Sequence, residues 1–259
     1  MPFIPGLVSV SFRPLAPDAL AALAARVGVQ AIEWGGDIHV PPGDLARARE
    51  VATITADHGL STACYGSYYR LGVSETDGLA FGTVLETATA LGAPSIRVWA
   101  GNTPSADISE ADRRTVTEDA VRCAEAAAQA GIKLALEYHG GTLTDCDASA
   151  VRLLNEAPHP NLYTLWQPIN GETRENNLTA LRHVLPRLLN LHVFHWTKPA
   201  ADIIRHPLAE GADNWAAYLG LAAKAPCERY CLLEFVLNDD PEQLATDAAT
   251  LREWLHHNG

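Results

Sequence analysis

Carboxylate, amide and imidazole side chains follow four successive apolar segments in the second half of the chain. Glu137 and His139 end the segment "KLALEYHGG", Gln167 ends "LYTLWQ", His195 lies in "LLNLHVFHW", and Glu234 lies in "RYCLLEFV". Oxygen and imidazole ligands of this kind suit a divalent cation such as Mn²⁺, Mg²⁺ or Co²⁺. We therefore predict a metal site formed by Glu137, Gln167, His195 and Glu234.

The segments that must position these side chains alternate between apolar runs typical of strands and the apolar spacing typical of amphipathic helices. Candidate strands lie at residues 7–12, 31–34, 61–65, 95–100, 133–139, 162–167, 188–196 and 229–236. Amphipathic helices are expected between them, because Pro17, Ser109 and Pro241 each precede an apolar stripe at helical spacing. Strand and helix thus alternate along the whole chain.

This alternation predicts an α/β protein, a single (β/α)8 TIM barrel that occupies residues 1–259 as one domain. Apolar strands that alternate with helices form a parallel sheet covered by those helices. Eight candidate strands favour a closed barrel over an open sheet, and no Gly-rich fingerprint follows the first strand. Because the carboxyl ends of all barrel strands meet at one face, the polar residues should converge there.

The amino-acid composition argues against nucleic acid and membranes as binding partners. The chain has 259 residues, 47% of them hydrophobic, and a formal net charge of −12 without a basic run. An acidic surface disfavours nucleic acid. No apolar stretch is long enough to cross a membrane and no signal sequence is evident, so we expect a soluble, cytoplasmic protein with no membrane partner. The five cysteines lack paired spacing and are interpreted as reduced thiols.

Further polar and aromatic residues lie at or after the same strand ends and are candidates for contacting a substrate. The predicted substrate-binding residues are Glu33, Trp34, His39, Tyr68, Arg97, Trp99, His139, Trp166, Asn170, Trp196 and Lys198. Tryptophan rings can pack on the C–H face of a sugar, although core packing is the alternative for each of them, and an interior ion pair is the alternative for Glu33 and Arg97. His192 is out of phase with His195, so we expect it to be a packed or surface histidine with little effect when replaced by alanine.

The segments "LALEYHGG", "TLWQPIN", "HVFHWTK" and "LLEFV" resemble, in that order, the xylose isomerase-like TIM-barrel superfamily and its sugar phosphate isomerase/epimerase group. The resemblance implies one divalent metal ion held by residues of strands five to eight, with Mn²⁺ expected and Mg²⁺, Co²⁺ or Zn²⁺ as alternatives. Glu137, His195 and Glu234 match that pattern. Gln167 departs from it, because the superfamily usually has a carboxylate at that position.

The resemblance also implies a function. We expect a metal-dependent isomerase or epimerase of a sugar, polyol or keto-sugar, in which protons pass through an enediolate between Glu137 and Glu234. Two alternatives stay open: a lyase of the same superfamily, either a dehydratase or a C-glycoside-cleaving enzyme, and a non-catalytic sugar-binding barrel, which the neutral Gln167 keeps in view. The expected partner is a small-molecule sugar or polyol substrate, and a homodimer is left open.

Overall fold

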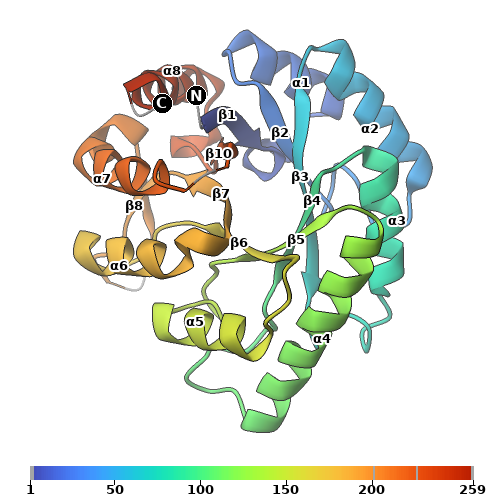
Figure 1. Cartoon of the computed structure of the whole chain (residues 1–259). Helices are drawn as coiled ribbons and strands as arrows, with labels where there is room; N and C mark the ends of the chain where they lie inside the picture. The colour runs from blue at the N-terminus through green and yellow to red at the C-terminus, as the bar shows by residue number, and fades with distance from the viewer. Residues whose placement is uncertain (1–2, 201, 226, 258–259) are drawn as a thin grey trace.

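The computed structural model describes residues 3–200, 202–225 and 227–257. Eight parallel strands close into a barrel in the order β1-β10-β7-β6-β5-β4-β3-β2, and helices surround it (Figure 1). The barrel strands are β1 (Phe3–Val8), β2 (Ala31–Gly35), β3 (Ser61–Arg70), β4 (Ser95–Trp99), β5 (Lys133–Glu137), β6 (Leu162–Trp166), β7 (Leu188–Val193) and β10 (Arg229–Leu233). The (β/α)8 fold expected from the sequence is confirmed.

Each barrel strand is followed by a helix of the outer layer. The helices are α1 (Pro17–Arg26), α2 (Leu45–Asp57), α3 (Phe81–Leu91), α4 (Glu110–Gln129), α5 (Asp147–Glu156), α6 (Arg174–Val184), α7 (Ala212–Ala222) and α8 (Pro241–His257). Short 3₁₀ turns lie at Ser9–Phe12, Leu185–Arg187, Leu208–Gly211 and Leu237–Asp239. None of the helices in the described part of the chain has the length and apolarity needed to span a bilayer.

The helices begin where the sequence places them. Pro17 is the first residue of α1 and Pro241 the first of α8. At the start of α4, the Ser109 hydroxyl accepts a hydrogen bond from the backbone N–H of Asp112 at 3.1 Å. This bond satisfies one of the N–H groups that lack a partner inside the helix.

Two apolar regions hold the layers together. The larger one lies between the strands and the helices, and it buries the stripes of all the long helices. The smaller one includes Ala31, Ala63 and Leu232, with Ile4 and Tyr230 packed against it. Because these side chains are buried against one another, the interior of the barrel is packed rather than an open pore.

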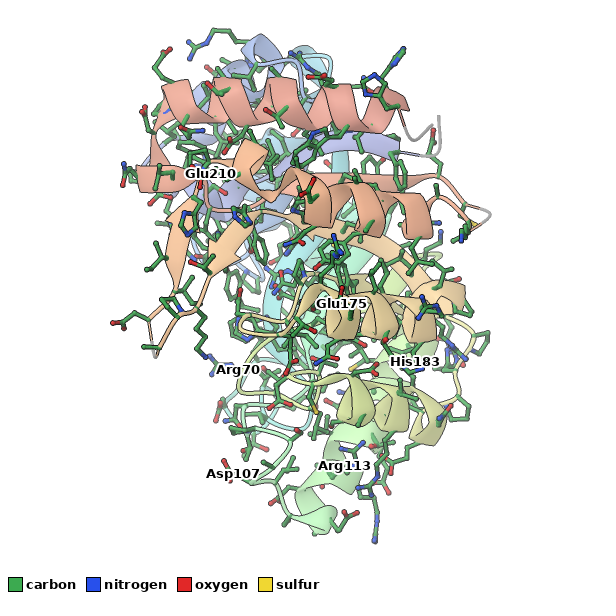
Figure 2. All side chains as sticks on the ribbon, turned by 90° about the vertical axis from the view of Figure 1, so that its left-hand side faces the viewer. Arg70, Asp107, Arg113, Glu175, His183 and Glu210 are labelled. Atoms are coloured by element: carbon green, nitrogen blue, oxygen red, sulfur yellow. The ribbon has the colours of Figure 1, made fainter. Side chains whose placement is uncertain are left out.

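A short antiparallel hairpin interrupts the regular alternation after β7. It consists of β8 (His195–Thr197) and β9 (Ile204–His206) and precedes α7. Figure 2 shows the hairpin projecting on the side where Arg70, Asp107 and Glu210 lie, all of which follow or end strands. The carboxyl ends of the barrel strands and the loops that follow them thus form one face of the molecule.

The Ser109 cap makes a testable contribution to stability. Replacing Ser109 with alanine should lower the free energy of unfolding by about 1 kcal/mol, because the N–H of Asp112 loses its acceptor. Urea unfolding monitored by circular dichroism measures this change. Thr115→Ala in the same helix is the control, since the Thr115 hydroxyl donates only to the Ala111 carbonyl within the helix. Equal stabilities of wild type and Ser109→Ala would contradict a stabilising role for the cap.

Candidate metal and catalytic site

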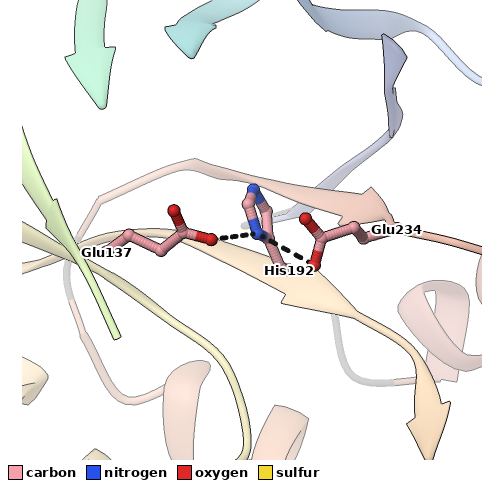
Figure 3. A group of neighbouring side chains, drawn as sticks. All are labelled: Glu137, His192 and Glu234. Carbon is pink, nitrogen blue, oxygen red and sulfur yellow. Dashed lines mark ion pairs between the residues drawn. The ribbon is translucent and has the colours of Figure 1, made fainter. Parts of the chain in front are cut away.

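Two glutamates and one histidine meet at the carboxyl ends of β5, β7 and β10 (Figure 3). His192 is fully buried in β7, and its Nδ1 lies 3.5 Å from Glu137 Oε1 and 3.4 Å from Glu234 Oε2. The three potential ligand atoms lie within 4.8 Å of one another. Glu137 and Glu234 are themselves almost completely buried. A buried group of two carboxylates and an imidazole has the chemistry of a divalent metal site.

Gln167, which follows β6, adds a fourth donor to this group. Its Oε1 lies 3.1 Å from His192 Nδ1. Its Nε2 donates a hydrogen bond to the Tyr138 carbonyl at 2.6 Å. Since that carbonyl can only accept, it orients the amide so that the oxygen faces His192 and the two glutamates. Gln167, which departs from the pattern of the superfamily, therefore presents an oxygen atom beside the other candidate ligands.

A second carboxylate and an arginine lie on the other side of His192. Glu33, in β2, is fully buried, and its Oε2 lies 3.1 Å from His192 Nε2. Arg97, in β4, donates from Nε to Glu33 Oε1 at 2.7 Å and from Nη1 to Glu137 Oε2. Glu33 and Arg97 thus form the interior ion pair that was the alternative to substrate binding for both residues. Arg97 also forms an ion pair with Glu137.

The pKa values of these groups are determined more by neighbouring charges than by burial. Burial alone disfavours a charged imidazole, but Glu234 and Glu33 outweigh it and hold the pKa of His192 well above its ordinary value. Burial alone would raise the pKa of Glu137, yet Arg97 and then His192 lower that pKa below its ordinary value. Glu33 follows the same pattern, because Arg97 and His192 lower its pKa against the effect of burial. Both carboxyls are therefore ionised at neutral pH.

The two glutamates of the group have different surroundings. Glu137 Oε2 accepts from Arg97 and also from Trp99 Nε1, which lies 2.5 Å away. No side chain of the described residues other than His192 lies within hydrogen-bonding or ion-pair distance of the Glu234 carboxylate. Glu137 is thus held on one oxygen by two N–H groups, whereas Glu234 is held by electrostatic attraction to one imidazole.

The structure corrects the choice of histidine. His195 is not a member of the group, because β7 ends at Val193 and His195 begins the β8–β9 hairpin. There its ring lies beside that of His206, with a centroid separation of 5.2 Å. The predicted strand over residues 188–196 extends past Val193, where β7 ends, so the alternation of side chains does not apply to His195. His192, which was expected to be a packed or surface histidine, provides the imidazole instead.

Three predicted substrate contacts belong to the protein interior. Trp34 and Trp166 are fully buried in the layer between strands and helices, where Trp34 Nε1 donates to Thr55 of α2 at 3.0 Å and Trp166 packs against Tyr218 of α7. His39 is buried with both ring nitrogens engaged, at 3.0 Å from Ser9 Oγ and 3.1 Å from the Leu15 carbonyl. Trp34 and Trp166 do not face the group around His192, because alternate residues of a strand point to opposite sides. His39 lies in the turn after β2, where its two contacts are to Ser9 and Leu15.

The other predicted contacts lie around the group or farther out. Tyr68 has a left-handed backbone, φ 58°, and its ring lies 5.0 Å from the Arg97 guanidinium and edge-on to Trp99. Trp99 in turn stacks on His139, with centroids 4.4 Å apart. The remaining three residues are less enclosed. Asn170 and Trp196 line a small cavity beside His195, and Lys198 is exposed.

The reassignment of His192 can be tested by stability. His192→Ala should lower the free energy of unfolding of the metal-free protein by about 3–5 kcal/mol, because three buried carboxylates lose the imidazolium between them. His195→Ala should cost about 1 kcal/mol or less, since His195 is only partly buried. Guanidinium unfolding of both variants measures the difference, and equal losses would contradict this assignment.

Comparisons with known proteins agree with the architecture. Residues 21–255 match the family described as the xylose isomerase-like TIM barrel. A 3-dehydroshikimate dehydratase of Bacillus anthracis is 40% identical over 167 residues, a match that spans 63% of this chain and 56% of the relative's length. The crystal structure of a probable 3-DHS dehydratase of B. anthracis, described as involved in petrobactin synthesis, superposes with a TM-score of 0.80 at 20% identity over 95% of this chain and 98% of that one.

A 3-keto-D-glucoside 4-epimerase of E. coli has the same fold, with a TM-score of 0.72 and 16% identity over 97% of this chain and 99% of that one. At such identities the similarity concerns the fold, and proteins of this fold carry different activities. The family match over residues 21–255 is stronger evidence, because it covers most of the sequence and includes His192 and the three residues around its Nδ1. The chain belongs to the xylose isomerase-like TIM barrel family.

Proposed function

We propose that this protein is a metal-dependent lyase that dehydrates a hydroxy-ketone of the 3-dehydroshikimate type. One observation carries the proposal: of the two glutamates beside His192 Nδ1, only Glu234 is free of N–H donors from other described side chains. A dehydration that begins next to a ketone needs one base, whereas epimerisation with return of the proton to the opposite face needs two. The named relative that is 40% identical to part of this chain is a dehydratase.

The donor set fits a divalent cation. Gln167 Oε1, Glu137 Oε1 and Glu234 Oε2 lie 3.1, 3.5 and 3.4 Å from His192 Nδ1, so three oxygen atoms and one nitrogen atom that can act as ligands are close together. With His192 neutral, the charges of Glu33, Glu137, Glu234, Arg97 and a divalent cation sum to zero. A carboxylate in place of Gln167 would leave the site negative. A cation bound by these four residues would supply positive charge opposite the oxygen of an enolate.

Glu234 is the residue that we assign as the base. It would take the proton from the carbon next to the substrate ketone, and the C–H electron pair would form the enolate. Glu137 is a poor proton acceptor by comparison, because Arg97 and Trp99 donate to its Oε2 and Arg97 contributes most to lowering its pKa. We therefore assign Glu137 the role of holding charge rather than moving protons.

His139 is the residue that we assign to protonate the hydroxyl group that leaves the substrate. Its ring stacks on Trp99, and its Nδ1 lies 2.7 Å from the Gly140 carbonyl, which can only accept, so Nδ1 carries the proton. Nε2 makes no hydrogen bond to the described residues and is available to a substrate hydroxyl or, once protonated, to donate to it. When the enolate re-forms the ketone, the hydroxyl on the next carbon would leave as water with a proton from this imidazole.

The isomerase or epimerase expected from the resemblance is the second candidate. The fold is shared with a sugar epimerase, and Glu137 Oε1 still faces the centre of the site opposite Glu234. Such an enzyme would need Glu137 to release its bonds to Arg97 or Trp99 during turnover. Mn²⁺ as the preferred metal, a sugar or polyol as the substrate and a homodimer all stay predictions.

Metal content tests the donor set. Wild-type protein loaded with Mn²⁺ and dialysed should retain about one equivalent by plasma mass spectrometry, as expected for a single site with four donors. Glu137→Gln should lose most of it, because a charged ligand becomes neutral. Gln167→Asp should retain the metal more tightly, since it adds a negative charge at the same position. Retention that is the same in all three proteins would contradict the assignment.

Product analysis tests the reaction. Incubation of the Mn²⁺-loaded protein with 3-dehydroshikimate should yield a product lighter by one water, and Glu234→Gln should reduce the rate by about 100- to 10,000-fold because the base is lost. Retention of metal by this variant must be measured in parallel, so that loss of the base is separated from loss of the ion. Exchange of substrate hydrogen with solvent deuterium without loss of water, on this compound or on a panel of keto-sugars, would favour the epimerase instead.

A further inference from the structure

The two ring nitrogens of His192 face different partners. Nδ1 faces Gln167, Glu137 and Glu234, whereas Nε2 lies 3.1 Å from Glu33 Oε2. We propose that Glu33 is a positioning residue that keeps the proton of His192 on Nε2, so that Nδ1 is the nitrogen presented to a divalent cation. This inference rests on the proposed function for the identity of the site, but the bond on which it depends is present in the metal-free protein.

The chemistry of the partners determines the tautomer. An ionised carboxylate can only accept hydrogen bonds, and Arg97, which donates to Glu33 Oε1 at 2.7 Å, keeps that carboxylate ionised. Glu33 Oε2 therefore requires a proton on His192 Nε2. Gln167, Glu137 and Glu234 present acceptor oxygens to Nδ1 as well, so both ring nitrogens carry protons in the metal-free protein. A divalent cation among those oxygens would take the place of the proton on Nδ1, while Glu33 would keep the proton on Nε2. A ligating histidine whose other nitrogen donates to a carboxylate is held in one orientation and is more basic as a ligand.

Glu33 is itself held in place by neighbouring strands. The pairing of β2 with β3 shifts register between Ile32 and Glu33. Gly66 of β3 leaves the required space, because a Cβ built there would lie 2.8 Å from Glu33 Oε1 and 2.6 Å from Arg97 Nη2. A glycine inside a strand often marks such a close approach. Arg97 donates to both Glu33 and Glu137. It therefore links the carboxylate beside His192 Nε2 to one of the two carboxylates beside Nδ1.

A direct contact between Glu33 and substrate is excluded by the same geometry. Glu33 has no exposed surface, and both of its oxygens are engaged, one by Arg97 and one by His192. It acts through His192, and the expectation that it binds substrate is replaced by this positioning role.

Binding of Mn²⁺ alone tests the proposal. Glu33→Gln keeps the size of the side chain but removes its charge, and it should weaken Mn²⁺ affinity by about 10- to 100-fold in isothermal titration calorimetry. Asp247→Asn is the matched control, because Asp247 is also a buried acid but its Oδ1 accepts hydrogen bonds from Leu208 N–H and Gln243 rather than from His192 or Arg97. This control should bind Mn²⁺ as wild type does. Wild-type affinity in Glu33→Gln would overturn the proposal.

Nuclear magnetic resonance of ¹⁵N-labelled histidine gives a readout that needs no variant. In the Zn²⁺-loaded wild-type protein, long-range ¹H–¹⁵N spectra should show His192 with Nε2 protonated and Nδ1 bound to metal. A metal on Nε2 would overturn the proposal, even if Glu33→Gln failed to fold.

The same spectra separate this inference from the proposed function. If wild type binds no divalent metal, the proposed function fails. In that case the metal-free protein should still show a slowly exchanging Nε2 proton on His192, and Glu33→Gln should exchange it faster. Equal exchange rates in the two proteins would overturn the positioning role independently of any metal.

Discussion

The site depends on one constraint: three carboxylates lie in the interior of a barrel, where unpaired charge is costly. Glu33, Glu137 and Glu234 are all buried, and the positive groups among them are Arg97 and the imidazole of His192. Each strand that contributes to the cluster is tied to another by one of these contacts. Removal of Arg97 or His192 would be costly, because the buried carboxylates would then exceed the remaining positive charge by two.

Gln167 is consistent with the same balance of charge. The family resemblance predicts a carboxylate at this position, whereas this chain has a neutral amide. In the structure the Tyr138 carbonyl orients the amide oxygen toward His192, so the residue offers a donor atom without adding a charge. Since the cluster already contains three carboxylates, of which Arg97 compensates one, a neutral fourth donor is what a divalent cation would require for neutrality. Glu33 thus supplies the negative charge that Gln167 lacks, although it lies behind the imidazole rather than among the four donors.

The difference between Glu137 and Glu234 bears directly on the reaction. Arg97 and Trp99 stabilise the ionised form of Glu137, and this lowers its tendency to take up a proton. Glu234 has no such donors among the described side chains. An active site with one restrained and one unrestrained carboxylate favours removal of a single proton followed by elimination. Two unrestrained carboxylates on opposite faces would favour epimerisation. The aromatic side chains of Tyr68, Trp99 and His139 lie in sequence beside Arg97 and Glu137, with Trp99 in contact with both of the others.

The sequence by itself determined the fold and the types of residue at the site. Eight apolar segments alternating with helical stripes specify the barrel, because strand and helix periodicities depend on local spacing. Proline and serine at helix starts act locally too, and Pro17, Ser109 and Pro241 begin or cap helices as expected. Glu137, Gln167 and Glu234 could be found because parallel strands of a barrel end at one face.

Only the tertiary structure decided which histidine joins them. The phase of a strand is meaningful only up to its last residue, and β7 ends at Val193 because the chain leaves the barrel there to form the β8–β9 hairpin. The roles of Trp34 and Trp166 were likewise decided by the helices that pack against the strands, and that of His39 by its contact with Leu15 in the loop before α1. The hydrogen bonds that distinguish Glu137 from Glu234 join residues about 40 positions apart in the chain. Contacts between such distant residues exist only once the barrel has closed, so no local pattern in the sequence could reveal them.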